Sequence, residues 1–195
     1  MEQLIDFVWK KGLIRPRDLV EIRIPRQYLS IACKQGKLKR VGRGLYSLPG
    51  KMLIENRSLA EVCKLVPSGI ICLVSALQFH GLTSQMPYDV WLAIDEKARI
   101  PRIDHIQIRV FHFSGLALSE GIESHQVEGA EIRVFNPAKT VADCFKYRNK
   151  IGLDIAIEAL KDCMQKRKAS IDELVQYSRI CRVERIMRPY LEALQ

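Results

Sequence analysis

The sequence lacks the long apolar run that a membrane protein needs, and it has few aromatic residues. Phe, Trp and Tyr make up 7% of the 195 residues, and no apolar stretch approaches the roughly 20 residues that cross a bilayer. Residues 1–6 carry two acids and no apolar core of a signal peptide. The hydrophobic fraction of 48% is that of an ordinary globular protein. We therefore expect a folded cytoplasmic protein that does not bind membranes.

Signatures of metal binding and catalysis are also missing. The six cysteines form no C-x-x-C pair and the four histidines do not cluster with them, so the sequence predicts reduced core cysteines and no metal site. There is no G-x-S-x-G or H-E-x-x-H motif. The run Asp95-Glu96-Lys97 has the residue types of a metal-dependent nuclease, but consecutive charges alternate across an extended chain, which favours a solvated strand end. We expect no enzyme activity and no cofactor.

Positive charge, in contrast, is abundant and concentrated at one end of the chain. The formal net charge is +9. Residues 1–51 hold 12 basic and 4 acidic side chains, whereas residues 52–195 hold 19 and 18. Because a compact basic segment attracts polyanions, the N-terminal quarter is expected to bind nucleic acid.

Residues 1–50 show the pattern of three short helices and a hairpin. Apolar residues recur at helical spacing over 4–9, and Pro16 and Pro25 suit the first turns of two further helices, the last from about 26 to 35. In the second helix Leu19 and Val20 are expected to face inward. Strand-like runs at 38–41 and 45–48 flank the glycines of residues 42–44. This order predicts a winged helix-turn-helix domain over residues 1–50.

The polar face of the third predicted helix carries side chains that can read bases. Arginine can pair with guanine and glutamine with adenine, and this face holds Arg26 and Gln27 opposite an apolar face. Further basic side chains lie in the expected wing. We predict binding to double-stranded DNA, and the alternative is a small basic helical domain that binds RNA, protein or nothing. The candidate DNA-binding residues are Arg17, Arg26, Gln27, Ser30, Lys34, Lys37, Lys39, Arg40 and Arg43.

Residues 58–195 predict a second domain of the α+β class. A capping box at Ser58 is expected to open a helix. Apolar or alternating runs at 70–73, 90–94, 106–111, 122–127 and 132–135 predict a small, largely antiparallel sheet. Asn136-Pro137, Gly152 and a second capping box at Ser170 mark helix starts, so the C-terminal third is expected to be helical. Pro189 is expected to kink or split the last helix.

Four arginines recur every third residue near the C-terminus. Such spacing favours one side of a helix, beside an apolar seam. One interpretation is a solvated polar face, and the other is a surface for a partner or for a second nucleic-acid contact. These residues are Arg179, Arg182, Arg185 and Arg188.

Four stretches together resemble the AbiEi-type antitoxin and transcriptional regulator family. They are GKLKRVGRGLY over residues 36–46, SALQFHGLT over 75–83, VFNPAKTVADCF over 134–145 and GLDIAIEAL over 152–160. The resemblance covers almost the whole chain. The sequence departs from the family where the second helix ends in Glu21-Ile22-Arg23, because the family often has a glycine turn there.

The resemblance implies a cytoplasmic DNA-binding repressor that is also the antitoxin of a type IV toxin–antitoxin pair active in phage defence. It implies binding to inverted repeats upstream of its own operon through the third helix and the wing. It also implies a nucleotidyltransferase-like toxin, opposed by the second domain without a stable one-to-one complex. The alternatives are a winged-helix transcription factor whose second domain senses a small ligand, and a nucleic-acid-processing enzyme.

Overall fold

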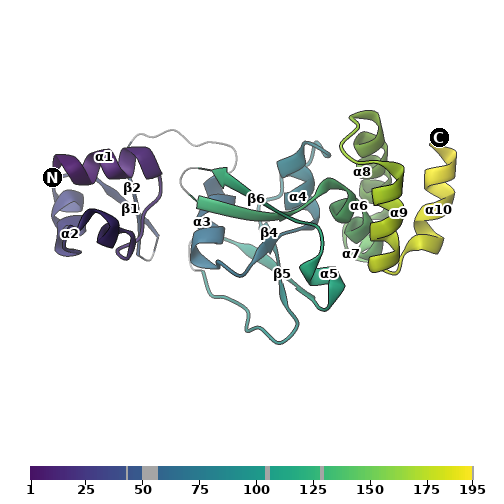
Figure 1. The fold of residues 1–195 in the computed structure, drawn as a ribbon, viewed down its shortest axis with the longest axis horizontal. Coiled ribbons are helices and arrows are strands. Elements are labelled where there is room, and N and C mark those ends of the chain that lie inside the picture. Colours follow the sequence, from purple (N-terminus) through teal and green to yellow (C-terminus); the bar gives the residue numbers. More distant parts are fainter. Residues whose placement is uncertain (43, 50–56, 104–105, 128–129, 195) are drawn as a thin grey trace. The chain divides into compact units, whose positions relative to one another are not determined.

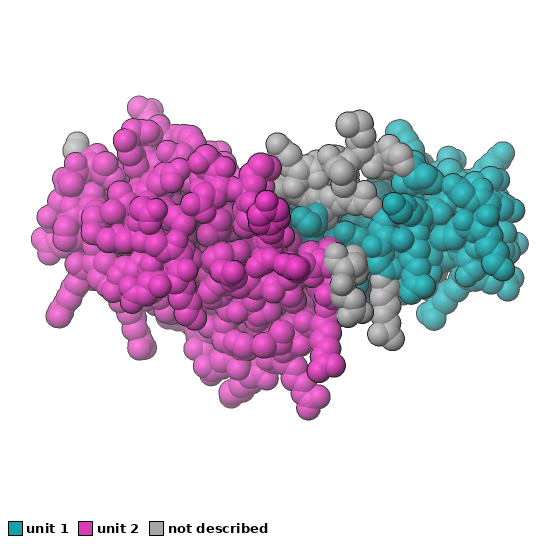
Figure 2. Space-filling view, turned by 180° about the vertical axis from the view of Figure 1, so that it is seen from behind, with its two compact units in different colours: residues 1–65, 126–132 teal, residues 66–125, 133–195 magenta. Residues whose placement is uncertain are grey.

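The computed structural model describes all residues except 43, 50–56, 104–105, 128–129 and 195 (Figure 1). The described residues form two compact units (Figure 2). Unit 1 contains residues 1–65 and 126–132, and unit 2 contains residues 66–125 and 133–195. The division into domains at 1–50 and 58–195 concerns independent folding, and it stays a prediction.

Unit 1 begins with three helical segments and a hairpin, as the sequence predicts. They are α1 (Glu2–Lys11), the 3₁₀ helix η1 (Asp18–Ile22), α2 (Gln27–Lys34), β1 (Lys39–Gly42) and β2 (Leu45–Ser47). One apolar cluster lies between them, to which each of the three helical segments contributes buried side chains from its inward face. The fully or nearly buried members are Leu4, Val8, Ile14, Leu19, Leu29, Ala32 and Leu38.

The second helical segment differs from its prediction. It is a 3₁₀ helix in which Leu19 is buried, while the side chain of Val20 is 74% exposed. A 3₁₀ helix repeats every three residues, so Leu19 and Ile22 share a face and Val20 does not. Arg23 ends this segment with φ 54°, in the left-handed region that glycine usually occupies. An arginine therefore adopts the conformation that a glycine turn would supply.

Unit 1 also contains α3 (Arg57–Leu65), in which Ser58 is the second residue and not the predicted N-cap. Lys64 Nζ donates a hydrogen bond to the carbonyl oxygen of Leu13, and this bond ties α3 to the segment after α1. Burial lowers the pKa of Lys64 to about 8, with Asp18 opposing that shift. The lysine therefore acts as an internal link of unit 1.

The central sheet has five strands in the order β5-β4-β3-β7-β6. Its strands are β3 (Ile70–Ile71), β4 (Val90–Asp95), β5 (Ile108–Phe113), β6 (Ile122–Val127) and β7 (Ala130–Phe135). β3 runs antiparallel to β4 but parallel to β7, and β4 runs parallel to β5. The prediction of a largely antiparallel sheet is therefore wrong, and the sheet is mixed.

Two features of the chain explain the difference. A long connection separates β4 from β5, which allows a parallel return where a tight turn would not. β5 begins two residues later than predicted and alternates in burial because it is an edge strand, so alternation alone does not indicate an antiparallel neighbour. The apolar run at 70–73 is also divided, since Leu73 already begins a helix.

Helices make up the rest of unit 2. They are α4 (Leu73–His80), α5 (Leu116–Ser119), α6 (Pro137–Lys146), α7 (Arg148–Ile151), α8 (Leu153–Gln165), α9 (Ile171–Ile180) and α10 (Glu184–Ala193). The predicted caps at Asn136 and Ser170 are confirmed: Asn136 Oδ1 accepts from Lys139 N at 2.8 Å, and Ser170 forms a full capping box with Glu173. α10 continues through Pro189. The helical C-terminal third is therefore confirmed.

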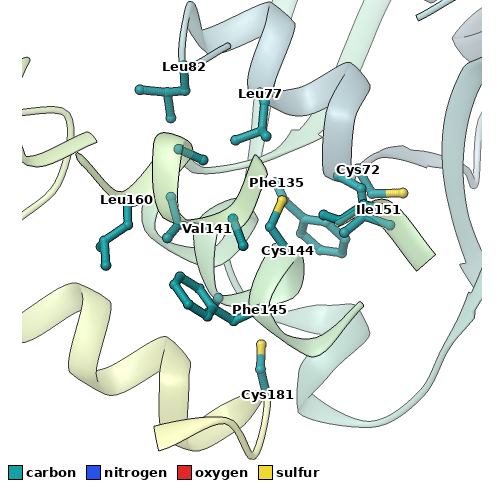
Figure 3. Close-up of a cluster of buried hydrophobic side chains, with 14 of the residues drawn as sticks. Cys72, Leu77, Leu82, Phe135, Val141, Cys144, Phe145, Ile151, Leu160 and Cys181 are labelled. Atoms are coloured by element: carbon teal, nitrogen blue, oxygen red, sulfur yellow. The ribbon is translucent and has the colours of Figure 1, made fainter. Parts of the chain in front are cut away.

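α6 is the centre of the unit 2 core. Its residues 138–145 are all buried, and Val141, Cys144 and Phe145 point into the cluster drawn in Figure 3. The same helix buries a Lys139–Asp143 ion pair in which both side chains are 0% exposed. All six cysteines are free thiols, and five of them are buried. Among the described helices none is long and apolar enough to cross a membrane.

Candidate nucleic-acid interface

α2 separates an apolar face from a polar one. Leu29 and Ala32 lie in the core of unit 1, with at most 1% of either side chain exposed. The opposite face holds Arg26 at the N-cap position, followed on the helix by Gln27, Ser30 and Lys34, and all four are exposed. The helical period of 3.6 residues produces this division. The polar face therefore offers two base-reading side chain types and a cation on one continuous surface.

The connection after α2 fixes where the hairpin begins. The backbone N–H groups of Lys37 and Leu38 both donate to the carbonyl oxygen of Ala32, at 2.9 and 3.2 Å. Gly36 allows this reversal with φ 69°. Leu38 is 3% exposed and anchors the turn in the core, while Lys37 and Lys39 on either side are exposed.

The hairpin is held at both of its strands. β1 and β2 pair antiparallel with Lys39 opposite Ser47 and Arg40 opposite Tyr46. Tyr46 also exchanges two backbone hydrogen bonds of 3.0 Å with Ile14. Arg40 Nε donates to the Gly42 carbonyl oxygen at 3.2 Å, which steadies its exposed guanidinium.

The charge of Arg40, on the hairpin, acts on a side chain of α2. Burial raises the pKa of the Cys33 thiol, and the positive charge of Arg40 opposes that shift. Cys33 lies on α2, so the helix and the hairpin contribute cations to the same region. Neither α2 nor the two hairpin strands contain an acidic residue. Arg43 lies outside the described residues.

Arg17 has a different environment. It precedes η1, is exposed, and lies with its Nε 3.9 Å from Asp18 Oδ1. Asp18 Oδ2 meanwhile accepts from the backbone N–H of Arg15 at 2.7 Å. Glu21, on η1, pairs with Lys11 at the end of α1, with Lys11 Nζ 2.5 Å from Glu21 Oε1. Both acids therefore have partners within the first 21 residues of the chain.

The C-terminal arginines do not lie along one helix, which corrects the geometric prediction. α9 ends at Ile180 and α10 begins at Glu184, and Arg182 lies between them with φ 60°. Arg179 Nε pairs with Glu184 Oε1 at 3.0 Å, and Arg188 Nε pairs with Glu192 Oε1 at 2.8 Å. The spacing of three continues through a turn, so the arginines divide between two helices and the segment joining them.

Unit 2 brings two further cations to this region that sequence spacing does not reveal. Lys146 and Arg148, at the end of α6 and the start of α7, line the same surface hollow as Arg179 and Arg182. More than thirty residues separate the two pairs, and no motif links them.

The residues of the nuclease alternative form a turn at the end of β4. Asp95 Oδ1 accepts from Lys97 N at 2.8 Å, and the side chains of residues 95–97 are exposed. In the described part of the chain no three His, Cys, Asp or Glu side chains are grouped so that they could hold a metal ion.

Comparison with known proteins finds a family match at the N-terminus and a solved structure with a similar fold. Residues 2–49 match the family model described as a transcriptional regulator, AbiEi antitoxin. The fold resembles the crystal structure of the Rv2827c protein from Mycobacterium tuberculosis, with a TM-score of 0.59 and 11% sequence identity, over 90% of this chain and 70% of that one. No curated protein matches the chain. The matched segment spans α1 to the end of the hairpin, and the chain therefore carries an AbiEi antitoxin and transcriptional-regulator domain at its N-terminus.

Proposed function

We propose that the protein is a DNA-binding autorepressor whose residues 1–49 act as a winged helix-turn-helix. The observation that carries this proposal is the exposed, acid-free face of α2 beside a basic hairpin, within the segment that matches a transcriptional-regulator family. In such a domain the second helix of the helix-turn-helix enters the major groove and the wing lies on the flanking backbone. α2 has the exposure and the side chains for that role.

The proposed DNA-binding residues divide into two groups by their chemistry. Arg26 is the N-cap residue of α2 and Gln27 is its first residue, and recognition helices commonly contact base edges with their N-terminal residues. Ser30 and Lys34 continue the same face. Lys37, Lys39 and Arg40 surround the start of the hairpin and suit phosphate contacts, which position the protein without reading sequence. Arg17 and Arg43 complete the proposed phosphate-binding set.

We further propose that the protein is the antitoxin of a type IV pair and opposes a nucleotidyltransferase-like toxin. The description of the matched family supports the antitoxin role. The stretches of unit 2 that resemble the family form α4, the β7–α6 junction and α8, which pack around one core. Unit 2 is therefore the proposed antitoxin part.

Repression is tested with a reporter gene under the control of the region upstream of the protein's own gene. The full chain is expected to repress it, and Arg26→Ala with Gln27→Ala is expected to remove most of the repression. Arg188→Gln is the matched control, since this exposed arginine lies in unit 2. Repression that survives the double substitution would contradict the role of α2.

The antitoxin role is tested by expressing a toxin of the nucleotidyltransferase class, which the proposal places in the neighbouring gene. Cells that also express the full chain are expected to grow. Cells that express only residues 1–65 are not expected to grow, because this fragment lacks unit 2. The fragment still contains α3 and the hydrogen bond from Lys64 to Leu13. Full protection by the fragment would contradict the division of roles.

A further inference from the structure

A basic hollow lies on the surface of unit 2 and contains none of the residues of the DNA-binding proposal. Its volume is about 690 Å³. It is lined by the ends of α6 and α9, the start of α7, the first turn of α10 with the segment before it, and residues 114–117, which include the start of α5. Four cationic side chains line it, namely Lys146, Arg148, Arg179 and Arg182, and none of its described lining residues is acidic. Cations collected from four separate segments around one concavity are typical of an anion site.

The orientation of two of these cations is fixed. Arg148 Nη1 donates to the Phe145 carbonyl oxygen at 3.0 Å. Arg179 Nε pairs with Glu184 Oε1 at 3.0 Å. Each guanidinium has five N–H donors, so these contacts hold the group in place while other donors stay available. Within the described residues neither Lys146 nor Arg182 forms an ion pair with a carboxylate closer than 4.0 Å. The charge of Lys146 acts on the buried carboxyl of Asp143, and its Nζ lies 5.8 Å from the centre of the Phe113 ring.

The floor of the hollow is apolar. Cys181 and Val183 are nearly buried there, and Ile186 is half-buried beside them. Beneath the floor the Cys181 thiol donates to Asp143 Oδ1 at 3.2 Å, and Asp143 is paired with Lys139, so the buried pair carries no net charge. The hollow thus combines a cationic rim with an apolar floor over a locally neutral core.

A second hollow of about 480 Å³ adjoins the first. The two hollows share Arg179, Arg182, Val183 and Ile186, and the second adds Glu184 and Arg185. The two hollows therefore extend the cationic rim along the turn between α9 and α10. Arg188 lines neither of them, since it points to Glu192 on the same helix.

We propose that this basic hollow binds a nucleotide, with its phosphate groups on the four cations and its base against the apolar floor. A volume of about 690 Å³ lies in the range of about 300–1,000 Å³ typical of small-molecule sites and exceeds what a single phosphate fills. Arginine guanidinium groups suit phosphate oxygens because they offer paired donors. The nucleotide can be free or the phosphorylated end of a strand, since both present the same groups.

The test measures binding of the full chain to ATP, pyrophosphate, adenosine, and a short single-stranded oligonucleotide with and without a 5′-phosphate. Isothermal titration calorimetry at a fixed ionic strength gives the affinities. ATP is expected to bind more tightly than pyrophosphate or adenosine, because only ATP uses both rim and floor. Preference for the 5′-phosphorylated oligonucleotide over ATP would identify a strand end as the source of the nucleotide.

The variant Lys146→Gln with Arg182→Gln is expected to weaken ATP binding at least tenfold. Arg188→Gln is the matched control and is expected to leave it unchanged, and an unchanged circular dichroism spectrum confirms the fold of each variant. Equal losses in both variants, absence of binding to every probe, or equal competition by a polyglutamate peptide would overturn the proposal. The last result would instead indicate a docking surface for acidic proteins. DNA binding by unit 1 is measured separately, so its failure does not affect this test.

Discussion

At the scale of single residues, the ion pair inside α6 is the most consequential contact. Lys139 Nζ lies 2.5 Å from Asp143 Oδ2, and neither side chain reaches solvent. Lys139 Nζ also lies 4.1 Å from the centre of the Phe135 ring, and Cys181 donates to the second carboxylate oxygen. Burial raises the pKa of Asp143, and Lys139 opposes that shift. Each buried charge therefore depends on the other for its stabilisation.

Removing the lysine alone is expected to be costly. Lys139→Met leaves a buried, unpaired carboxylate and should lower the free energy of unfolding by about 3–5 kcal/mol. Adding Asp143→Leu should restore most of the lost free energy of unfolding, because the double variant no longer buries a carboxylate. Urea denaturation of the full chain measures the free energy of unfolding of both variants. Lys161→Met, at an exposed lysine of α8, is the control and should stay within about 0.5 kcal/mol.

The pH dependence of this loss has a definite sign. A carboxyl whose pKa is higher in the folded than in the unfolded state makes the fold less stable as pH rises through that interval. Without Lys139 the pKa of Asp143 rises further, so the interval widens towards neutral pH. The deficit of Lys139→Met relative to the unaltered protein should be larger at pH 8 than at pH 5. A deficit that is equal at both values would show that lost packing, and not the charge, causes the effect.

The cysteines give a second prediction at this scale. Burial raises the pKa of Cys72, Cys144 and Cys181 and raises that of Cys163 to about 11, so few of these thiols are ionised at neutral pH. Cys33 is half-exposed. A thiol reagent at pH 7 should therefore label one cysteine quickly in the native protein and six after unfolding. Rapid labelling of two or more native thiols would contradict the described core.

At the scale of elements, one glycine lets β6 begin directly beside α6. Gly121 has φ 75°, its carbonyl oxygen accepts from Asn136 N at 2.7 Å, and an added Cβ would lie 2.8 Å from Lys139 Cβ. Gly81 at the end of α4 has φ 68°, but an added Cβ there would meet nothing within 4 Å. The two glycines share a backbone conformation and differ in the space around them.

The two alanine substitutions should therefore differ in cost. Both carry the left-handed backbone penalty of about 1–2 kcal/mol. Gly121→Ala adds a collision with the backbone-proximal part of α6, which should cost about 1–3 kcal/mol more. Thermal denaturation of both variants measures the difference. Equal melting temperatures would mean that β6 can move away from α6 freely.

The elements also show how far sequence patterns reach. Caps at Asn136 and Ser170 are local side chain contacts, so their residue types predict them correctly. Strand direction in the sheet is not local, because β3 pairs with β7 across more than fifty residues and a two-residue strand carries almost no periodicity. The sequence predicts that Val20 faces inward, but η1 is a 3₁₀ helix and Val20 is exposed. The residue types of this segment do not distinguish a 3₁₀ helix from an α-helix.

At the scale of the whole molecule, the two charged surfaces differ in how the sequence reveals them. The surface of α2 and the hairpin comes from one continuous stretch, residues 26–47, so composition and helical period predict its exposed face. The basic hollow needs Lys146 and Arg148 beside Arg179 and Arg182, and only the packing of α6, α7 and α9 brings them together. The charge of residues 52–195 is nearly balanced, so composition gives no sign of it.

The central claim, that α2 reads DNA, is tested most directly by the ratio of two affinities. The full chain is titrated over a range of salt with a duplex from upstream of its own gene and with a random duplex of equal length. Arg26→Ala and Gln27→Ala should each lower the ratio of the two affinities by about 1–3 kcal/mol. Lys39→Ala should weaken both complexes alike and reduce the salt slope by about one, as expected for a phosphate contact. An unchanged ratio in the α2 variants, or equal losses on both duplexes in all three, would contradict base reading by α2.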